Sequence, residues 1–150
     1  ERLGEREGIA SLPRPAGRLV WVHAASVGET MSALPVIRLL AGQGPVLLTT
    51  GTVTSARLAA ERLPERAVHQ FVPLDVPGWT RRFLDHWRPD AAVFLESEIW
   101  PNLLAACDAR GIRRFLVNGR LSAASTRNWR RAPGTARTLL GGFAAIHAQS

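Results

Sequence analysis

Glu29 is the first residue in the chain whose position suggests acid–base chemistry. It lies in the segment A-S-V-G-E-T, directly after Gly28 and at the start of an amphipathic run. The dipole of a helix and its free backbone N–H groups stabilise a carboxylate at the helix start, so Glu29 could act as a general base. Its spacing from Ser26 also fits a capping box, in which Ser26 caps the helix and Glu29 bonds back. Both roles can coexist in one residue.

A second pair of carboxylates, Glu96 and Glu98, flanks Ser97 at the end of a strongly apolar run. In an extended segment residues two apart share a face, so both carboxylates could point into one crevice. The alternative is that one of them caps the helix expected to open at Pro101 while the other is solvated. A metal site is a weaker third interpretation, because few other acids are near and the four histidines are not at ligand spacing.

A threonine-rich run, T-T-G-T-V-T, contains Thr50 and Thr52 and follows another apolar stretch. Its hydroxyls and backbone N–H groups could hold an anion or a sugar at a helix start, or it could be an ordinary capped turn. It matches neither a Walker loop nor a G-x-G-x-x-G fingerprint, which argues against nucleotide hydrolysis and dinucleotide binding. No G-x-S-x-G motif occurs, and no Ser-His-Asp set can be assigned.

Short apolar runs alternate with longer amphipathic runs along the chain, and they predict the strands and helices that position these loops. The apolar runs lack a clean period of two, which is typical of strands buried on both faces of a parallel sheet. The repeated strand–helix–strand order predicts an α/β, Rossmann-like open parallel sheet with helices on both faces. Ligands bind such sheets beyond the carboxyl ends of the strands, where the polar loops stand. We expect strands at 19–24, 46–50, 70–73, 91–95, 115–118 and 144–148, and helices at 30–41, 54–63, 78–87, 101–110 and 137–143.

The domain organisation follows from length and composition. A chain of 150 residues fits one compact domain, and we place it at 19–150, after a polar lead-in at 1–18 that we expect to be extended or partly mobile. Pro35 inside the first long helix predicts a kink or a delayed start. The single cysteine, Cys107, excludes an internal disulfide, and no apolar run approaches the ~20 residues of a membrane span, so we expect a soluble, cytosolic chain.

The charge is unevenly distributed along the chain. Residues 1–108 contain eleven Arg and twelve acidic residues, whereas residues 109–150 contain eight Arg and no acid. A basic segment can bind nucleic acid, an anionic lipid surface or a phosphorylated substrate, and charge alone does not choose among them. A stand-alone α/β module that binds an anionic ligand without catalysis is therefore the alternative to an enzyme.

Several motifs together resemble one family. The motifs V-H-A-A-S-V-G-E-T (22–30), the threonine run, F-V-P-L-D (71–75), E-S-E-I-W-P-N (96–102), N-G-R-L-S (118–122) and the final A-Q-S occur in one order. In this order and spacing they resemble the N-terminal domain of 3-deoxy-D-manno-octulosonic acid (Kdo) transferases. The resemblance covers nearly all of the chain from Leu19 onward. Even G-E-R-E-G (4–8) resembles the segment that follows this family's membrane anchor.

The resemblance implies an inverting, metal-independent GT-B glycosyltransferase that needs no cofactor. Such an enzyme moves Kdo from CMP-Kdo to the lipid A precursor, lipid IVA, during lipopolysaccharide core synthesis at the cytoplasmic face of the bacterial inner membrane. It implies that Glu29 is the general base and that Glu96 stabilises the transition state. The acceptor-binding residues that we expect are Ser26, Gly28, Thr50, Thr52, Glu98, Asn102, Asn118 and Arg120.

Three positions depart from the family pattern without touching Glu29 or Glu96. Val53 and Ser55 stand where Pro and Gly are usual, and Gly119 replaces Ala. The CMP-Kdo-binding domain and the membrane anchor of the family lie outside this chain, so we expect the isolated domain to be inactive alone. We expect its basic end to face an anionic membrane surface, and we expect no nucleic acid partner.

Overall fold

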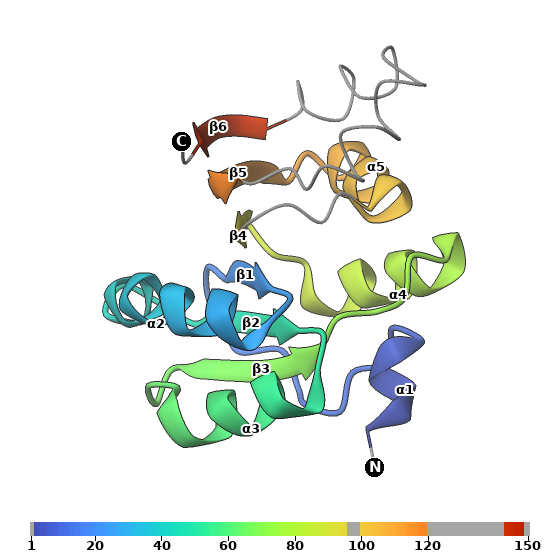
Figure 1. The fold of residues 1–150 in the computed structure, drawn as a ribbon. Coiled ribbons are helices and arrows are strands. Elements are labelled where there is room, and N and C mark those ends of the chain that lie inside the picture. Colours follow the sequence, from blue (N-terminus) through green and yellow to red (C-terminus); the bar gives the residue numbers. More distant parts are fainter. Residues whose placement is uncertain (1, 96–99, 120–142, 149–150) are drawn as a thin grey trace.

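The chain folds as a six-stranded parallel sheet covered by helices (Figure 1). The computed structural model describes residues 2–95, 100–119 and 143–148, with side chains described as far as residue 117. The strand order is β3-β2-β1-β4-β5-β6, the order of a Rossmann-like fold, which confirms the predicted fold class. The strands are β1 (Val20–Ala24), β2 (Val46–Thr50), β3 (Ala67–Phe71), β4 (Ala91–Leu95), β5 (Arg113–Gly119) and β6 (Phe143–Ala148).

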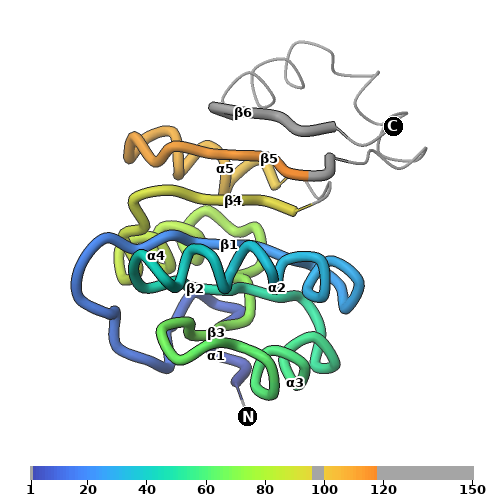
Figure 2. Tube along the Cα trace, turned by 90° about the vertical axis from the view of Figure 1, so that its left-hand side faces the viewer, coloured from blue at the N-terminus to red at the C-terminus, as the bar shows by residue number. Residues whose placement is uncertain are grey.

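Helices pack on both faces of this sheet (Figures 1 and 2). Five are present in the described part of the chain: α1 (Leu3–Arg6), α2 (Val27–Ala41), α3 (Val53–Arg62), α4 (Pro77–Trp87) and α5 (Pro101–Ala109). One face buries α2 and α3 against β1 and β2, where Ile37 of α2 and Ala59 of α3 are fully covered. The other buries α4 and α5 around Trp21, whose ring lies 5.0 Å from Phe83 and 5.1 Å from Phe94 between centroids. Two cores thus fix the sheet from both sides.

The helix starts follow from local capping. The Ser26 side chain accepts a hydrogen bond from Glu29 N at 3.2 Å, so α2 begins at Val27. The expectation that Pro35 delays this helix is wrong, since Pro35 lies inside a helix that is already capped at Ser26. Thr52 caps α3 in the same way, and α4 and α5 each begin with a proline in the first turn.

Several predicted boundaries need correction. Helix α2 begins at Val27 rather than at 30, and β5 covers Arg113–Gly119 rather than 115–118. Strand β3 covers 67–71 rather than 70–73, because two buried polar residues, His69 and Gln70, weaken its apolar signal. The His69 ring shares a hydrogen bond with the Thr50 hydroxyl at 2.8 Å, and Gln70 Oε1 accepts one from Trp87 Nε1 at 2.8 Å. Phe143, the expected last residue of the helix at 137–143, instead begins β6, and the rest of that helix lies outside the described residues.

The lead-in at 1–18, which we expected to be extended, contains a short helix, α1, at residues 3–6. Glu5 in this helix is buried, and its carboxylate accepts hydrogen bonds from Phe71 N at 2.8 Å and from Arg2 Nε at 2.9 Å. The carbonyl of Arg6 accepts a further bond from Leu74 N at 2.8 Å. These bonds dock α1 beside the end of β3 (Figure 1). The sequence did not predict this helix, because the Phe71 N–H that Glu5 binds is 66 residues away in the sequence.

Candidate functional site

The carboxyl ends of four strands lie side by side at one edge of the sheet. Ala24 at the end of β1 pairs with Thr50 of β2 and with Leu95 of β4, and Thr50 pairs with Phe71 of β3. The loops after these strands therefore leave the sheet at one level. The chain order reverses between β1 and β4, and this switch point is where ligands bind in open α/β sheets.

Glu29 lies at this edge, in the first turn of α2. Its Oε2 atom accepts a hydrogen bond from Ala25 N at 2.6 Å, while its own N–H donates to the Ser26 hydroxyl. This is a reciprocal cap of the kind that the spacing predicted, with the glutamate reaching one residue further back than in a standard capping box. The cap holds a half-buried carboxylate at the positive end of α2. That Glu29 is a base stays a prediction.

The other predicted carboxylates follow β4. Glu96 and Glu98 lie outside the described residues, as does Arg120, and Asn118 is described only as part of strand β5. The roles of these four residues stay predictions. Because β4 adjoins β1, the chain enters the segment that holds Glu96 and Glu98 beside the strand that leads to Glu29.

The two predicted threonines occupy different environments. Thr50 is fully buried, and its hydroxyl shares a hydrogen bond with His69 inside the sheet. Thr52 is the cap of α3, with its Oγ1 atom 3.1 Å from Ser55 N. Ser26 and Gly28 are exposed on the neighbouring loop. The structure therefore brings Ser26, Gly28 and Thr52 to the surface of this edge and leaves Thr50 beneath it.

Asn102 ties two loops together. Its side-chain amide donates to Asp75 O at 2.9 Å, and its backbone N–H lies 3.1 Å from Asp75 Oδ2. Leu103 N donates to Asp75 Oδ1 at 2.8 Å. Asp75, from the motif F-V-P-L-D, therefore caps α5 from a distant loop. A contact of Asn102 with an acceptor stays a prediction.

A pocket of about 270 Å³ opens among these loops. It lies where β1, β2 and β3 end, and its wall includes Arg6, Ala25, Thr52, Leu74, Asp75 and Trp100. Among the predicted site residues that the structure describes, Thr52 alone lines it. Sequence reasoning missed the other polar residues, Arg6 and Asp75, although each stands in a motif that the family resemblance had singled out.

The pocket and the candidate base share a backbone connection. Ala25 N holds the Glu29 carboxylate, and Ala25 O accepts a hydrogen bond from Gly51 N at 3.2 Å. Gly51 O in turn accepts one from Arg6 Nη2 at 2.6 Å. Three hydrogen bonds therefore connect Glu29 to Arg6 through the loops after β1 and β2.

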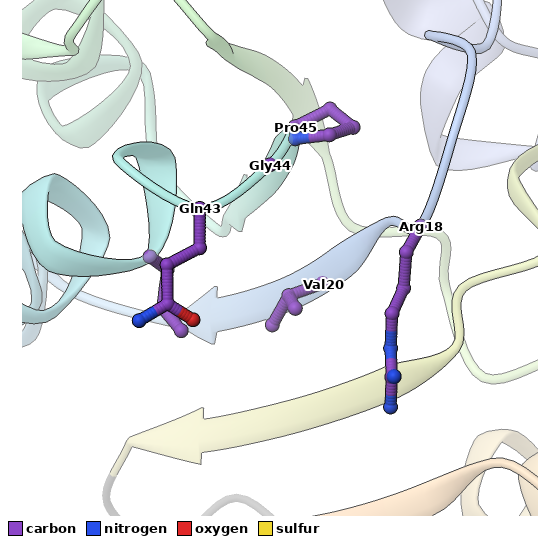
Figure 3. Close-up of a pocket in the computed structure, with 6 residues that line it drawn as sticks. Arg18, Val20, Gln43, Gly44 and Pro45 are labelled. Atoms are coloured by element: carbon purple, nitrogen blue, oxygen red, sulfur yellow. The ribbon is translucent and has the colours of Figure 1, made fainter.

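A second pocket, of about 370 Å³, lies at the opposite edge of the sheet (Figure 3). It is lined by Arg18, Gln43 and Pro45 around the start of β1, where Val20 begins the strand. None of the predicted site residues within the described ranges lines it. The amino edge of a parallel sheet lacks the convergent helix starts that bind ligands, so the functional candidate is the carboxyl edge.

A buried histidine lies under the carboxyl edge. The His23 ring shares a hydrogen bond with the Thr49 hydroxyl at 2.9 Å, and its centroid lies 4.7 Å from the ring of Trp100. Burial lowers the pKa of His23 to about 3, so the ring is neutral near pH 7 and supports the pocket wall rather than moving protons. Within the described residues no group of three or more His, Cys, Asp or Glu side chains could hold a metal ion.

The basic end of the chain is partly neutralised inside the fold. Arg114 is fully buried and pairs with Asp108 at 2.7 Å, and Arg110 pairs with Asp85 at 2.5 Å. Arg113 is exposed, with its guanidinium 5.5 Å from the Phe115 ring centroid. Two of the three described arginines of this end are therefore used in ion pairs. No helix in the described part of the chain has the length and apolarity to span a membrane.

The fold and this polar edge define an α/β Rossmann-like domain, consistent with the N-terminal domain of a GT-B glycosyltransferase. Comparison with known proteins identifies the family. The family model described as 3-deoxy-D-manno-octulosonic-acid transferase (kdotransferase) matches residues 1–150. The chain belongs to this family.

Curated relatives agree with the family match. A probable mitochondrial 3-deoxy-D-manno-octulosonic acid transferase from Arabidopsis thaliana is 43% identical over 131 residues, covering 85% of this chain and 29% of the relative. The 3-deoxy-D-manno-octulosonic acid transferase of Rickettsia typhi is 39% identical over 138 residues, covering 90% and 30%. That of Bordetella pertussis is 42% identical over 124 residues, covering 79% and 29%. The chain thus spans about three tenths of the length of these relatives.

Proposed function

We propose that this chain is the acceptor-binding domain of an inverting, metal-independent Kdo transferase. In this proposal the acceptor is the lipid A precursor, lipid IVA, the donor is CMP-Kdo, and the reaction belongs to lipopolysaccharide core synthesis at the inner membrane. The donor would be bound by a further domain that these 150 residues do not include. Membership of the family supports the transferase class, and the polar carboxyl edge supports the assignment of the acceptor to this domain.

In the proposed reaction Glu29 is the general base. It takes the proton from a hydroxyl of the acceptor sugar while that oxygen attacks the anomeric carbon of Kdo. The new C–O bond forms as the bond between this carbon and the phosphate oxygen breaks, and CMP leaves with the bonding electrons. Attack from the face opposite the leaving group inverts the configuration. Glu96 would stabilise the positive charge that develops on the Kdo ring.

The observation that carries the proposal is the fixed carboxylate of Glu29 at the switch point of the sheet. The Ala25 N–H bond at 2.6 Å and the Ser26 cap restrict its position. The start of α2 stabilises its negative charge, and a carboxyl group must be ionised before it can accept a proton. Positioning of this kind lowers the entropic cost of bringing base and hydroxyl together.

The test uses a completed transferase, in which residues 1–150 are joined to the part of the Rickettsia typhi relative that follows its matched segment. We expect transfer of labelled Kdo from CMP-Kdo to lipid IVA, and we expect the transfer to persist in a chelator. Glu29→Ala should abolish transfer and leave CMP-Kdo binding intact. A completed protein that binds CMP-Kdo but transfers no Kdo to lipid IVA would refute the proposal.

The alternative is a non-catalytic module that binds an anionic ligand such as nucleic acid through the basic end. Ligand-binding measurements on this chain distinguish this module from the transferase. Retention of nucleic acid with a steep salt dependence, together with no preference for phosphorylated over dephosphorylated lipid IVA, would favour that module. The ion pairs of Arg110 and Arg114 weaken this alternative, because they remove two cations from the basic surface that it requires.

A further inference from the structure

Arg6 is the arginine of the pocket at the carboxyl edge, and its guanidinium is held in place by neutral groups. Nη2 donates to Gly51 O at 2.6 Å, and the guanidinium carbon lies 4.4 Å from the centre of the Phe71 ring. Both contacts orient the group without cancelling its charge. The neighbouring Arg2 also lies over Phe71, at 5.0 Å, but lines a different groove beside α3.

The charge of Arg6 lacks a carboxylate partner within the described part of the chain. The ion pairs found there involve Arg2, Arg14, Arg110 and Arg114. Two acids adjoin Arg6 in the sequence. Glu5 bonds to Arg2, Ser11 and Phe71 N instead, and Glu7 takes part in none of these ion pairs. Burial lowers the pKa of Arg6, although Glu5 opposes this effect, so the cation is partly stripped of water. A partly desolvated arginine with donors to spare is a strong binding group for an oxyanion.

The remaining polar groups of the pocket do not oppose an anion strongly. Asp75 carries a negative charge, but both of its carboxylate oxygens accept N–H bonds at the start of α5. The positive end of that helix offsets its charge. Thr52, also in the pocket lining, caps α3, and the N-terminus of that helix adds positive potential. Trp100 supplies an apolar surface on which a sugar ring can pack.

We propose that Arg6 binds a phosphate group of the acceptor sugar in this pocket and so positions a nearby hydroxyl of the same acceptor at Glu29. The inference rests on the proposed function and adds a specificity-determining residue to it. The hydrogen-bonded path from Arg6 through Gly51 and Ala25 to Glu29 makes the distance between anion and base a fixed property of the two loops. An acceptor without the phosphate then loses both affinity and alignment.

The test measures binding to this 150-residue chain by calorimetry, independently of transfer. The probes are the deacylated disaccharide bisphosphate backbone of lipid IVA, the same disaccharide after phosphatase treatment, and inorganic phosphate. We expect the bisphosphate to bind at least about tenfold more tightly than the dephosphorylated disaccharide, which is the effect of one charge-assisted hydrogen-bonded contact. Removing the acyl chains removes membrane attraction from the comparison.

The variants separate the role of Arg6 from the docking of α1. Arg6→Gln should reduce the preference for the bisphosphate to about one, whereas Arg6→Lys, which keeps the charge, should retain part of it. Arg2→Gln is the matched control, since Arg2 contacts the same ring from the same segment but does not line the pocket. It should keep the full preference. Thermal unfolding of each variant reports whether α1 stays docked.

Four outcomes would overturn the inference. The first is an original chain that shows no preference for the bisphosphate, and the second is an Arg6→Gln variant that keeps the preference. The third is an equal loss of preference in Arg2→Gln. The fourth is inorganic phosphate binding as tightly as the disaccharide bisphosphate, which would indicate a free-phosphate site. A failure of the proposed function is seen separately, as absence of Kdo transfer by the completed transferase.

Discussion

Gly8 fixes the turn that follows α1, and replacing it with alanine should destabilise the fold. Gly8 has φ +80, a left-handed conformation that non-glycine residues adopt at a cost of roughly 1–2 kcal/mol. A Cβ atom added there would lie 2.1 Å from Trp79 O and 3.2 Å from Phe83 N, both backbone atoms of α4. The backbone must move to admit the methyl group, and overpacking of this kind costs about 1–3 kcal/mol more.

Gly17 provides a matched control. It is also left-handed, with φ +96, but an added Cβ would have no atom within 4 Å. Gly17→Ala should therefore lose only the backbone contribution, about 1–2 kcal/mol. The effect of alanine on the unfolded chain is the same in both variants and cancels in the comparison. The difference between them isolates the packing of the lead-in on α4.

The assay is chemical and thermal unfolding of the two variants and the original chain. We expect Gly8→Ala to lose at least about 1 kcal/mol more than Gly17→Ala, or about 2–4 °C in Tm for each kcal/mol. Hydrogen exchange at Phe71 N and Leu74 N, which bond to α1, should accelerate in Gly8→Ala alone. Equal losses in both variants, with unchanged exchange, would refute the docked position of residues 2–8.

Two further predictions concern the histidines and the loop of Glu29. Burial lowers the pKa of His23 to about 3 and that of His69 to about 4, from 6.5, so the unfolded chain takes up protons that the folded chain does not. The unfolding free energy is therefore greatest above about pH 6.5 and falls toward pH 4, by up to roughly 1.4 kcal/mol per pH unit for each histidine. Urea unfolding at several pH values measures this slope, which His69→Gln should lower by half; a flat profile would contradict the burial of both rings. Gly28→Ala should leave the Tm unchanged or slightly raised, because the nearest atom to an added Cβ is Ser26 Oγ at 4.0 Å. In the completed transferase it should cost roughly 10- to 100-fold in kcat/KM for the acceptor, since in the proposed function the methyl group would stand where the acceptor approaches Glu29; unchanged kcat/KM would place the acceptor elsewhere.

Much of the fold could be predicted because its signals are local. The strands at 46–50 and 91–95 are continuous apolar runs, and the helix starts at Ser26 and Thr52 are short-range capping patterns. The predicted range of strand β3 was wrong because its buried residues His69 and Gln70 are polar. Their hydrogen bonds to Thr50 and Trp87 join distant parts of the chain, and such partners leave no periodic pattern.

Only part of the candidate site could be predicted from the sequence. In the predicted parallel sheet the loops of Glu29 and Thr52 follow strand ends that lie at one edge. Arg6 could not be placed there, because its segment reads as polar and broken by glycine and proline, and because Glu5 docks it through a bond to Phe71. Thr50 illustrates the opposite difficulty. Its position in a hydroxyl-rich loop suggested that it binds a ligand, but Thr50 is buried and its hydroxyl shares a hydrogen bond with His69 instead.

The turnover number of Glu29→Gln in the completed transferase tests directly whether Glu29 is the general base. The glutamine amide oxygen can still accept the bond from Ala25 N, so this variant keeps the cap and loses only the base. If Glu29 is the base, kcat for Kdo transfer falls by about 10²–10⁴-fold, while the Tm and the KM for lipid IVA stay near their original values. A kcat close to that of the original enzyme would contradict a catalytic role and show that Glu29 is a helix cap.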